Sequence, residues 1–496
     1  MESNQFLFGL TTGIALAGIA NFLLSTYATL TLVKAEASNA EHQLSSPVKE
    51  SERKVKHVSS RGSMKSTERL EKEFTLSKEK LHEIVKHLLK EMQRGLSSED
   101  QTVRMIPSHV VNRPKGTETG AFLALDLGGS NFRVCEVVLE GGGAVRMRQK
   151  KFVVSEALKI GPGVALFDFF AECIAEFLRE IGHKDSDFPL GFTFSFPCEQ
   201  TSLNSGFLIS WTKGFTAAGV EGKDPVELLQ QALKRKKLKI RVKALVNDTV
   251  GALMAHAYQD PSTYIGVILG TGTNAAYVEQ IQNIPKWNGP IPESNEMIIN
   301  TEWGAFDEEG VVLPTNQYDA LVDRHSAHPR IQPFEKMISG LYLGEITRYV
   351  LLDLVSTGEL FSGESSSILR RPYSFDTAQM SRIERDHSVE LSDTRSVLKD
   401  LFEIHNSNIH DRRLVKRVCE LIGTRSARLA AAGIAALVSK INRLDDCTVA
   451  MEGSLFDRYP HYANRMRDAL RELIGITAEN ITLVQGILFF LVFVYC

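Results

Sequence analysis

The sequence has few cysteines, and their spacing indicates neither a disulfide framework nor a metal site. The six cysteines are far apart, without a CxxC pair or a His–Cys cluster, which favours reduced thiols in a cytosolic domain. A strong charge of one sign is also missing, because the formal net charge is −3. No basic field therefore argues for nucleic-acid binding. The sequence contains no Walker A loop and no protein-kinase signature, so neither of those nucleotide-binding folds is supported.

Charged residues are absent from residues 6–33, a stretch longer than the roughly 20 apolar residues that a membrane-spanning helix needs. A cleaved signal peptide is the alternative, because Ala35-Glu36-Ala37 resembles a cleavage site. The length of the run and the lack of a preceding Lys or Arg favour an anchor, assigned to residues 1–33. Basic residues follow the run, which predicts a cytosolic main portion. The sequence does not distinguish the mitochondrial outer membrane from the endoplasmic reticulum.

The rest of the chain is long enough for more than one domain, since single hydrophobic cores stop growing at roughly 250–300 residues. Residues 34–68 are rich in Ser, Glu and Lys, and this composition predicts a polar flexible linker. Apolar residues at helical spacing begin near Leu70 and continue to Leu89. This pattern predicts a packing helix with one apolar face.

Two segments have an apolar strand that ends in glycines and small polar residues, at 123–134 and 264–274. Such a turn exposes backbone N–H groups to a phosphate, although a glycine-rich hairpin without a ligand has the same pattern. The presence of two such units favours the phosphate interpretation. It predicts two similar α/β lobes, residues 69–255 and 256–485, whose loops face one another across a cleft.

Eight segments together resemble the hexokinase family, in the order and at the spacing of that family. They are LDLGGSNFRV at 125–134, LGFTFSFPCEQ at 190–200, SWTKGF at 210–215, ALVNDTVGAL at 244–253, LGTGTNAAYVE at 269–279, INTEWGAF at 299–306, FEKMISGLYLGEI at 334–346 and VAMEGSLFDRYPHY at 449–462. The resemblance implies an α/β fold with two actin-like, ribonuclease-H-like lobes. It also implies transfer of the ATP γ-phosphoryl group, with Mg²⁺, to the 6-hydroxyl of glucose, fructose or mannose, a reaction that feeds glycolysis.

The resemblance also implies which residues bind the sugar. They are Ser195, Thr212, Lys213, Asn247, Asp248, Asn274, Glu302 and Glu335. Amides, carboxylates and an ammonium group suit a polyol, because paired donors and acceptors discriminate hydroxyl groups. Asp248 is the implied general base. From the residues alone, a helix N-cap is the favoured role for Asp248. Glu302 and Glu335 are, from the residues alone, candidate surface glutamates. We expect Trp211 and Trp303 to pack in the core rather than stack on a sugar.

On the nucleotide side, the resemblance implies two phosphate loops and an adenosine site. Asp126 would hold Mg²⁺ through water, in keeping with the reluctance of this ion to lose its hydration shell. The implied nucleotide-binding residues are Asp126, Gly128, Gly129, Ser130, Asn131 and Arg133 in the first loop, Gly270, Thr271, Gly272 and Thr273 in the second, and Gly453 and Ser454 at the adenosine.

The sequence departs from the family pattern at two places. Asp307 stands where the family usually has glycine, and a positive φ at this position would strain the loop beside Glu302. The tail, residues 486–496, is apolar from Ile487 onward, too short to span a bilayer. This apolar ending predicts that the protein with this C-terminus is unstable or binds ATP weakly. Both departures favour the alternative function, a catalytically weak sugar sensor or regulatory binding protein.

Overall fold

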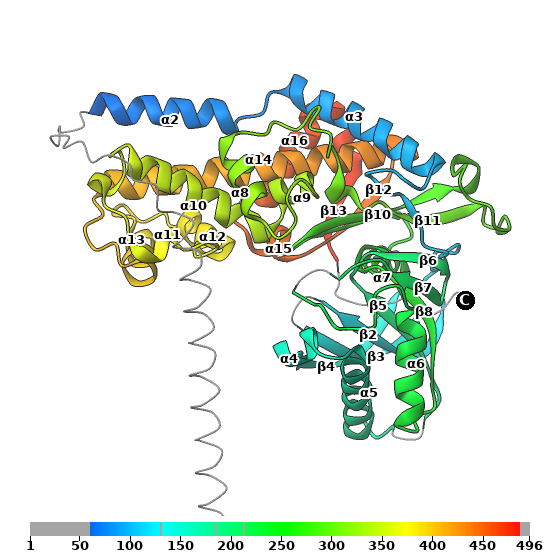
Figure 1. Cartoon of the computed structure of the whole chain (residues 1–496). Coiled ribbons are helices and arrows are strands. Elements are labelled where there is room, and N and C mark those ends of the chain that lie inside the picture. Colours follow the sequence, from blue (N-terminus) through cyan, green and yellow to red (C-terminus); the bar gives the residue numbers. More distant parts are fainter. Residues whose placement is uncertain (1–59, 129–130, 184–185, 212–213, 487–496) are drawn as a thin grey trace, which may run out of the picture. The chain divides into compact units, whose positions relative to one another are not determined.

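The computed structural model describes residues 60–128, 131–183, 186–211 and 214–486 (Figure 1). The predicted anchor, most of the predicted linker and residues 487–496 of the predicted tail lie outside the described residues. Two large sheets, each with its own helices and apolar core, and a small two-stranded sheet make up the described part.

The first sheet has five strands in the order β4-β3-β2-β5-β8. Their bounds are β2 (Thr119–Leu127), β3 (Asn131–Gly141), β4 (Ala144–Val153), β5 (Phe188–Phe194) and β8 (Ile240–Val246). β2, β3 and β4 pair antiparallel, whereas β5 runs parallel to both β2 and β8. Helices α5 (Gly163–Glu180) and α6 (Pro225–Arg235) share a core with this sheet, in which Phe132 stacks on Phe170 at 4.4 Å between ring centroids. Shorter elements here are α4 (Glu156–Ile160), β6 (Cys198–Ser202) and β7 (Ser205–Leu208).

The second sheet has six strands in the order β1-β11-β10-β9-β12-β13. The strands are β1 (Ile106–Pro107), β9 (Thr263–Leu269), β10 (Thr273–Gln280), β11 (Glu296–Asn300), β12 (Cys447–Glu452) and β13 (Ile481–Gln485). β9 pairs antiparallel with β10 and parallel with β12. The carboxyl ends of β9 and β12 therefore coincide at one edge, where ligands bind in open α/β sheets.

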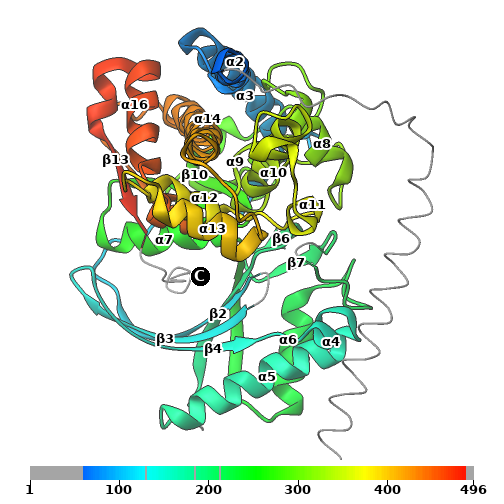
Figure 2. The same ribbon diagram turned by 90° about the vertical axis from the view of Figure 1, so that its left-hand side faces the viewer.

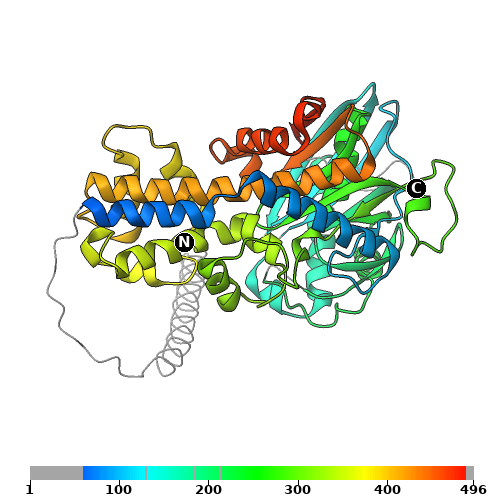
Figure 3. The same ribbon diagram turned by 90° about the horizontal axis from the view of Figure 1, so that it is seen from above.

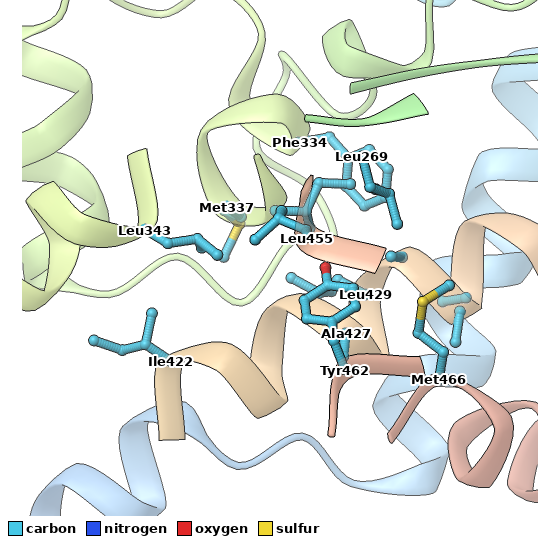
Figure 4. Close-up of a cluster of buried hydrophobic side chains, with 14 of the residues drawn as sticks. Leu269, Phe334, Met337, Leu343, Ile422, Ala427, Leu429, Leu455, Tyr462 and Met466 are labelled. Atoms are coloured by element: carbon cyan, nitrogen blue, oxygen red, sulfur yellow. The ribbon is translucent and has the colours of Figure 1, made fainter. Parts of the chain in front are cut away.

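The second core contains most of the helices. They are α2 (Ser60–Phe74), α3 (Lys78–Ser97), α8 (Gln317–His325), α9 (Pro333–Ile338), α10 (Gly340–Ser356), α11 (Ser367–Arg370), α12 (Thr377–Arg385), α13 (Ser392–Phe402), α14 (Ile409–Ile441), α15 (Ser454–Arg458) and α16 (Tyr462–Ile474), with 3₁₀ turns η1 (Ile281–Asn283), η2 (Trp303–Ala305), η3 (Phe361–Gly363) and η4 (Gly475–Asn480). Figure 4 shows part of this core, where Leu429 of α14 lies near Tyr462 and Leu455.

Helix α14 is the long central element of this core, and α2 runs along it (Figure 3). Within residues 60–486, as far as they are described, it is the one helix long and apolar enough to cross a membrane, with a mean hydropathy of 1.3. However, 89% of its most apolar 18-residue window is buried by the rest of the protein. A helical segment that is apolar on all sides is expected at the centre of a large core, and residues 429–438 of α14 are such a segment, all apolar and all buried.

Helix α7 (Asp248–Gln259) lies between the two sheets (Figures 1 and 2). Val250 and Leu253 pack against apolar residues of β10 and β11. Ala255 and Tyr258 pack against β2 and β3 on the other side. This position explains why the sequence of the helix is apolar around its whole circumference, and it fixes the first turn of α7 relative to both sheets.

The structure corrects the predicted bounds at the N-terminal side. Residues 60–68 belong to α2 rather than to a flexible linker, and Arg69 pairs with Asp353 of α10 at 2.7 Å. The single predicted helix is two helices, because the Ser77 side chain caps α3 by accepting a hydrogen bond from the Lys80 N–H. Both helices pack in the second core, and β1 joins the second sheet. The apolar face of residues 70–96 is buried against α14 in the second core, although these residues precede the first sheet.

Candidate active site

The glycine-rich loop at 270–272 joins β9 to β10 and is pinned to the first turn of α10. The Gly340 N–H donates to the Gly270 carbonyl at 2.7 Å, and the Leu341 N–H donates to the Thr271 carbonyl at 3.1 Å. The backbone of Gly453 lies against the start of the same loop and has a φ of +112°. A Cβ at this position would lie 2.3 Å from the Leu269 carbonyl oxygen. Only glycine fits such a close approach of two backbones. Ser454 begins α15 beside this contact and is exposed.

Amide and carboxylate side chains from both sheets form one hydrogen-bonded network. Asn247 lies between β8 and α7, whereas Asn274 lies on β10. Asn274 Nδ2 donates to Asn247 Oδ1 at 3.3 Å, to Asn300 Oδ1 at 2.7 Å and to Glu302 Oε1 at 3.2 Å. Asn300 Nδ2 also donates to Glu302 Oε1 at 2.8 Å. Three of the predicted sugar-binding residues, Asn247, Asn274 and Glu302, are thus brought together, and Asn300 is a fourth member that the motifs did not indicate.

The Glu335 carboxylate reaches the second loop from α9. Its Oε2 accepts a hydrogen bond from the Thr273 N–H at 2.9 Å, and a Cβ at Gly272 would lie 2.6 Å from the same oxygen. Thr273 Oγ1 accepts a hydrogen bond from Trp303 Nε1 at 3.0 Å. The loop predicted to face phosphate and the glutamate predicted to face sugar are therefore in direct contact.

Asp248 is the first residue of α7, and the helix cap is Asn247 rather than Asp248. The backbone of Asn247 is extended, and its side-chain Oδ1 accepts a hydrogen bond from the Thr249 N–H at 2.9 Å. Asp248 Oδ1 accepts the same N–H at 2.9 Å. The half-buried Asp248 carboxylate lies in the first turn, where the helix dipole favours negative charge. Because capping is done by its neighbour, Asp248 does not have to serve as the cap.

The carboxyl ends of β2 and β12 bring further charges to this region. Asp126 near the end of β2 is buried, and Arg133 Nη1 donates to its Oδ2 at 3.2 Å. Glu452 ends β12, and burial together with the charges of Asp248 and Asp126 raises its pKa to about 8. This glutamate precedes Gly453 in the motif at 449–462, but nothing in the local sequence distinguishes it from a surface residue.

Several predicted residues are described only by their place in the chain, or lie outside the described part. Ser195 follows β5 and is buried, and Gly128 follows β2. Gly129, Ser130, Thr212 and Lys213 lie outside the described residues, as does the side chain of Asn131. The site is therefore described from the remaining predicted positions.

Both tryptophans pack in the core, as expected. Trp211 is 7% exposed and stacks on Phe215 with a centroid separation of 5.3 Å. Trp303 is 1% exposed and packs edge-on against Phe334. Neither presents an open ring face for a sugar.

Asp307 has the positive φ that a glycine would tolerate, at +63°. Its carboxylate compensates, because it accepts backbone N–H groups of Val311, Val312 and Leu313 at 2.7, 2.9 and 2.6 Å. The expected strain is therefore accompanied by three charge-assisted hydrogen bonds that hold the loop. The hydrogen bonds of its carboxylate thus offset the backbone strain that Asp307 introduces in place of the usual glycine.

Comparisons with known proteins agree with this architecture. Two hexokinase family models match residues 66–258 and 264–486. Hexokinase-1 of Schizosaccharomyces pombe is 42% identical over 409 residues, covering 82% of this chain and 84% of that protein. Hexokinase-1 of Nicotiana tabacum is 44% identical over 411 residues, covering 80% of this chain and 82% of its own.

A solved structure of a hexokinase from Schistosoma mansoni complexed with glucose superimposes with a TM-score of 0.81. It is 40% identical and covers 86% of this chain and 96% of that one. The fold and the site elements define a two-lobed α/β protein of the sugar-kinase type, so the predicted fold class is confirmed for the described residues. With these matches, the chain belongs to the hexokinase family.

Proposed function

We propose that this chain transfers the γ-phosphoryl group of ATP to the 6-hydroxyl of a hexose, with Asp248 as the general base. Phosphorylation of a hexose follows from the family, whose relatives named above are hexokinases. The single observation that supports the residue assignment is the network that joins Asn247, adjacent to Asp248, to Asn274 and Glu302 across the two sheets.

The network has the chemistry that a sugar requires. The Asn274 amide and the Glu302 carboxylate are largely removed from water and already oriented by hydrogen bonds to one another. The hydroxyl groups of a bound polyol would form hydrogen bonds with these amide and carboxylate groups. An analogue that lacks one hydroxyl would leave one of these polar groups without a partner, which disfavours its binding. Glu335 supplies a second carboxylate beside the glycine loop.

Asp248 is suited to accept the hydroxyl proton. Its carboxylate is fixed in the first turn of α7 by the Thr249 N–H, and α7 itself is buried between the sheets. A base held in one position can act on a hydroxyl placed in line with the phosphoryl group, and positioning supplies much of the catalysis in such reactions. As the sugar oxygen attacks the γ-phosphorus, its proton passes to an Asp248 carboxylate oxygen. The bond between the γ-phosphorus and the β,γ-bridging oxygen breaks, and ADP leaves with the electron pair.

The residues on the nucleotide side fit Mg²⁺ with ATP. Burial and the negative charges of Asp248 and Asp126 raise the pKa of Glu452 to about 8, whereas Arg133 opposes this rise. Such a set is stabilised by an added cation, and Asp126 would hold Mg²⁺ through water. When bound, Mg²⁺ neutralises charge on the phosphates. The N–H groups of Thr271 and Gly272 would contact the phosphates, since those of Gly270 and Thr273 already donate within the protein. Gly453 and Ser454 would lie near the adenosine.

The test is replacement of the proposed base. We expect Asp248→Asn and Asp248→Ala to lower kcat by at least about 10²–10⁴-fold, because general-base catalysis contributes that much. Glucose binding, measured by calorimetry, should be largely retained. Asp445→Asn, a change at an exposed aspartate, is the matched control and should have wild-type turnover. Near-normal turnover of both Asp248 variants would refute the assignment.

The alternative function is that of a sugar sensor with little catalysis. Assays on the wild-type protein distinguish it from the kinase. A coupled assay with glucose, ATP and Mg²⁺ measures turnover, and calorimetry measures glucose binding. Binding without turnover would favour the sensor. Turnover within the usual range of enzymes, about 1–10³ s⁻¹, would favour the kinase.

We also propose that residues 1–33 anchor the protein to the mitochondrial outer membrane or the endoplasmic reticulum, with the catalytic part in the cytosol. The uncharged run at 6–33 and the basic residues after it support this proposal. Fractionation of cells that express residues 1–70 fused to a fluorescent protein tests it. A soluble cytosolic fusion would refute the anchor, and co-sedimentation with one organelle would identify the membrane.

A further inference from the structure

Three side chains outside the proposed phosphotransfer site converge where α3 meets the loop after η2. His87 and Glu91 lie one helical turn apart on α3, and Asp307 follows Phe306 in the loop. His87 Nε2 lies 3.2 Å from Glu91 Oε1 and 3.8 Å from Asp307 Oδ1. One ligand atom from each residue lies within 4.8 Å of the other two. The side chains of Glu91 and Asp307 are 8% and 0% exposed, whereas His87 is 20% exposed.

These separations match a metal site. With metal–nitrogen and metal–oxygen bonds of about 2.1 Å, two ligands of a tetrahedral ion lie about 3.4 Å apart. The two measured separations, 3.2 and 3.8 Å, bracket that value. A His and a Glu four residues apart on a helix lie on the same face, so α3 supplies two ligands without a change of backbone.

The two carboxylates are held in place by other groups. Asp307 Oδ1 accepts the Val311 N–H, and Glu91 Oε1 accepts the Asp307 N–H at 3.2 Å. A carboxylate oxygen has about two lone-pair sites, so each of these oxygens retains one for a further partner. The His87 ring packs on Phe306 with 5.9 Å between ring centroids, which limits its rotation. The three ligand atoms are thus ordered by their surroundings before any ion arrives.

We propose that His87, Glu91 and Asp307 bind a divalent transition-metal ion of the zinc class. One imidazole and two carboxylates supply three ligands, and the partly exposed side of His87 leaves a fourth position for water. The imidazole disfavours Mg²⁺ and Ca²⁺, which prefer sets of oxygen ligands. Asp307 is five positions after Glu302, and the metal therefore joins α3 to the segment that carries a proposed sugar-binding glutamate. This inference does not depend on the proposed kinase activity.

The experiment uses the metal-stripped full chain without ATP or sugar. Equilibrium dialysis against Zn²⁺ gives the number of ions bound per chain, and we expect His87→Gln to bind one fewer than the wild type. Zn²⁺ should raise the melting temperature of the wild type, because a ligand that binds only the folded state stabilises it. The rise should be absent in His87→Gln. Co²⁺ as a spectroscopic probe should show visible bands in the wild type and none in His87→Gln.

His82→Gln is the matched control, because His82 is an exposed histidine on the same helix. It should bind Zn²⁺ as the wild type does. Equal zinc stoichiometry and equal thermal shifts in His87→Gln and wild type would overturn the proposal. Equal loss in both histidine variants would also overturn it, since it would indicate binding to surface histidines. If circular dichroism shows that His87→Gln does not fold, Glu91→Gln decides the matter by the same two measurements.

Discussion

The buried carboxyl group of Glu452 makes stability depend on pH near neutrality. Glu452 is 8% exposed at the end of β12. Burial is the largest cause of its pKa of about 8, and the charges of Asp248, Asp126 and Asp457 add to it, against the opposing effect of Arg133. In the unfolded chain the pKa of this carboxyl is near the ordinary glutamate value of 4.5. The folded protein therefore retains a proton that the unfolded chain has lost.

The sign of the effect follows from this difference in pKa. Stability from Glu452 is fully present below the unfolded pKa of 4.5 and is lost as the pH rises through the folded value of about 8. Between pH 6 and pH 8, the free energy of unfolding should fall by about 2 kcal/mol because of this group, at about 1.36 kcal/mol per pH unit. Glu452→Gln replaces the carboxyl by a neutral amide of similar shape, so this contribution should disappear.

Urea unfolding of the wild type and Glu452→Gln at pH 6, 7 and 8 measures the effect. The difference between the two free energies of unfolding should change by about 2 kcal/mol over this range, in favour of the variant at high pH. Glu293→Gln is the control, because Glu293 is exposed, and its curve should parallel that of the wild type. Parallel curves for wild type and Glu452→Gln would show that the carboxyl is ionised throughout and would refute the reasoning.

Two further substitutions test the contacts around the glycine loop. In Gly272→Ala the new Cβ would lie 2.6 Å from Glu335 Oε2 and displace the carboxylate that accepts the Thr273 N–H. The KM for glucose in a coupled assay should rise about tenfold or more, because a hydrogen bond to a charged group is worth about 1.5–3 kcal/mol; an unchanged KM would contradict the contact. Asp307→Gly removes three hydrogen bonds to a carboxylate and relieves a positive φ, so urea unfolding should show a net loss of about 2–4 kcal/mol. A variant as stable as the wild type would mean that backbone strain cancels those bonds.

Much of the local structure could be predicted from the sequence. An apolar run followed by glycine indicates a strand and its turn wherever it occurs, and both predicted strands are present as β2 and β9. Ala165–Ile181 is typical of a helix and is nearly the whole of α5. The bulk of Trp211 and Trp303 predicted burial, which is confirmed. These features depend on neighbouring residues, and neighbours are visible in a sequence.

The partition of the chain between the two cores could not be predicted in the same way. Residues 70–96 precede the first sheet but pack against α14 in the second core. An apolar helical face predicts burial without naming its partner. The helix cap at Asn247 is a smaller case, since Asn and Asp are nearly equal as caps and only the backbone geometry distinguishes them.

The sequence by itself determined the hexokinase motifs, the strand-to-glycine turns and the candidate residues, because each rests on residue types at short spacing. Tertiary structure alone decided which of them meet. Asn247 contacts Asn274 because β8 ends where β10 begins. Glu452 has a raised pKa because other segments bring Asp126 and Asp248 close to it. His87 meets Asp307 because α3 packs beside η2. Charge, hydrogen bonding and metal coordination act through distance in space, and the folded chain sets that distance between residues that the sequence keeps apart.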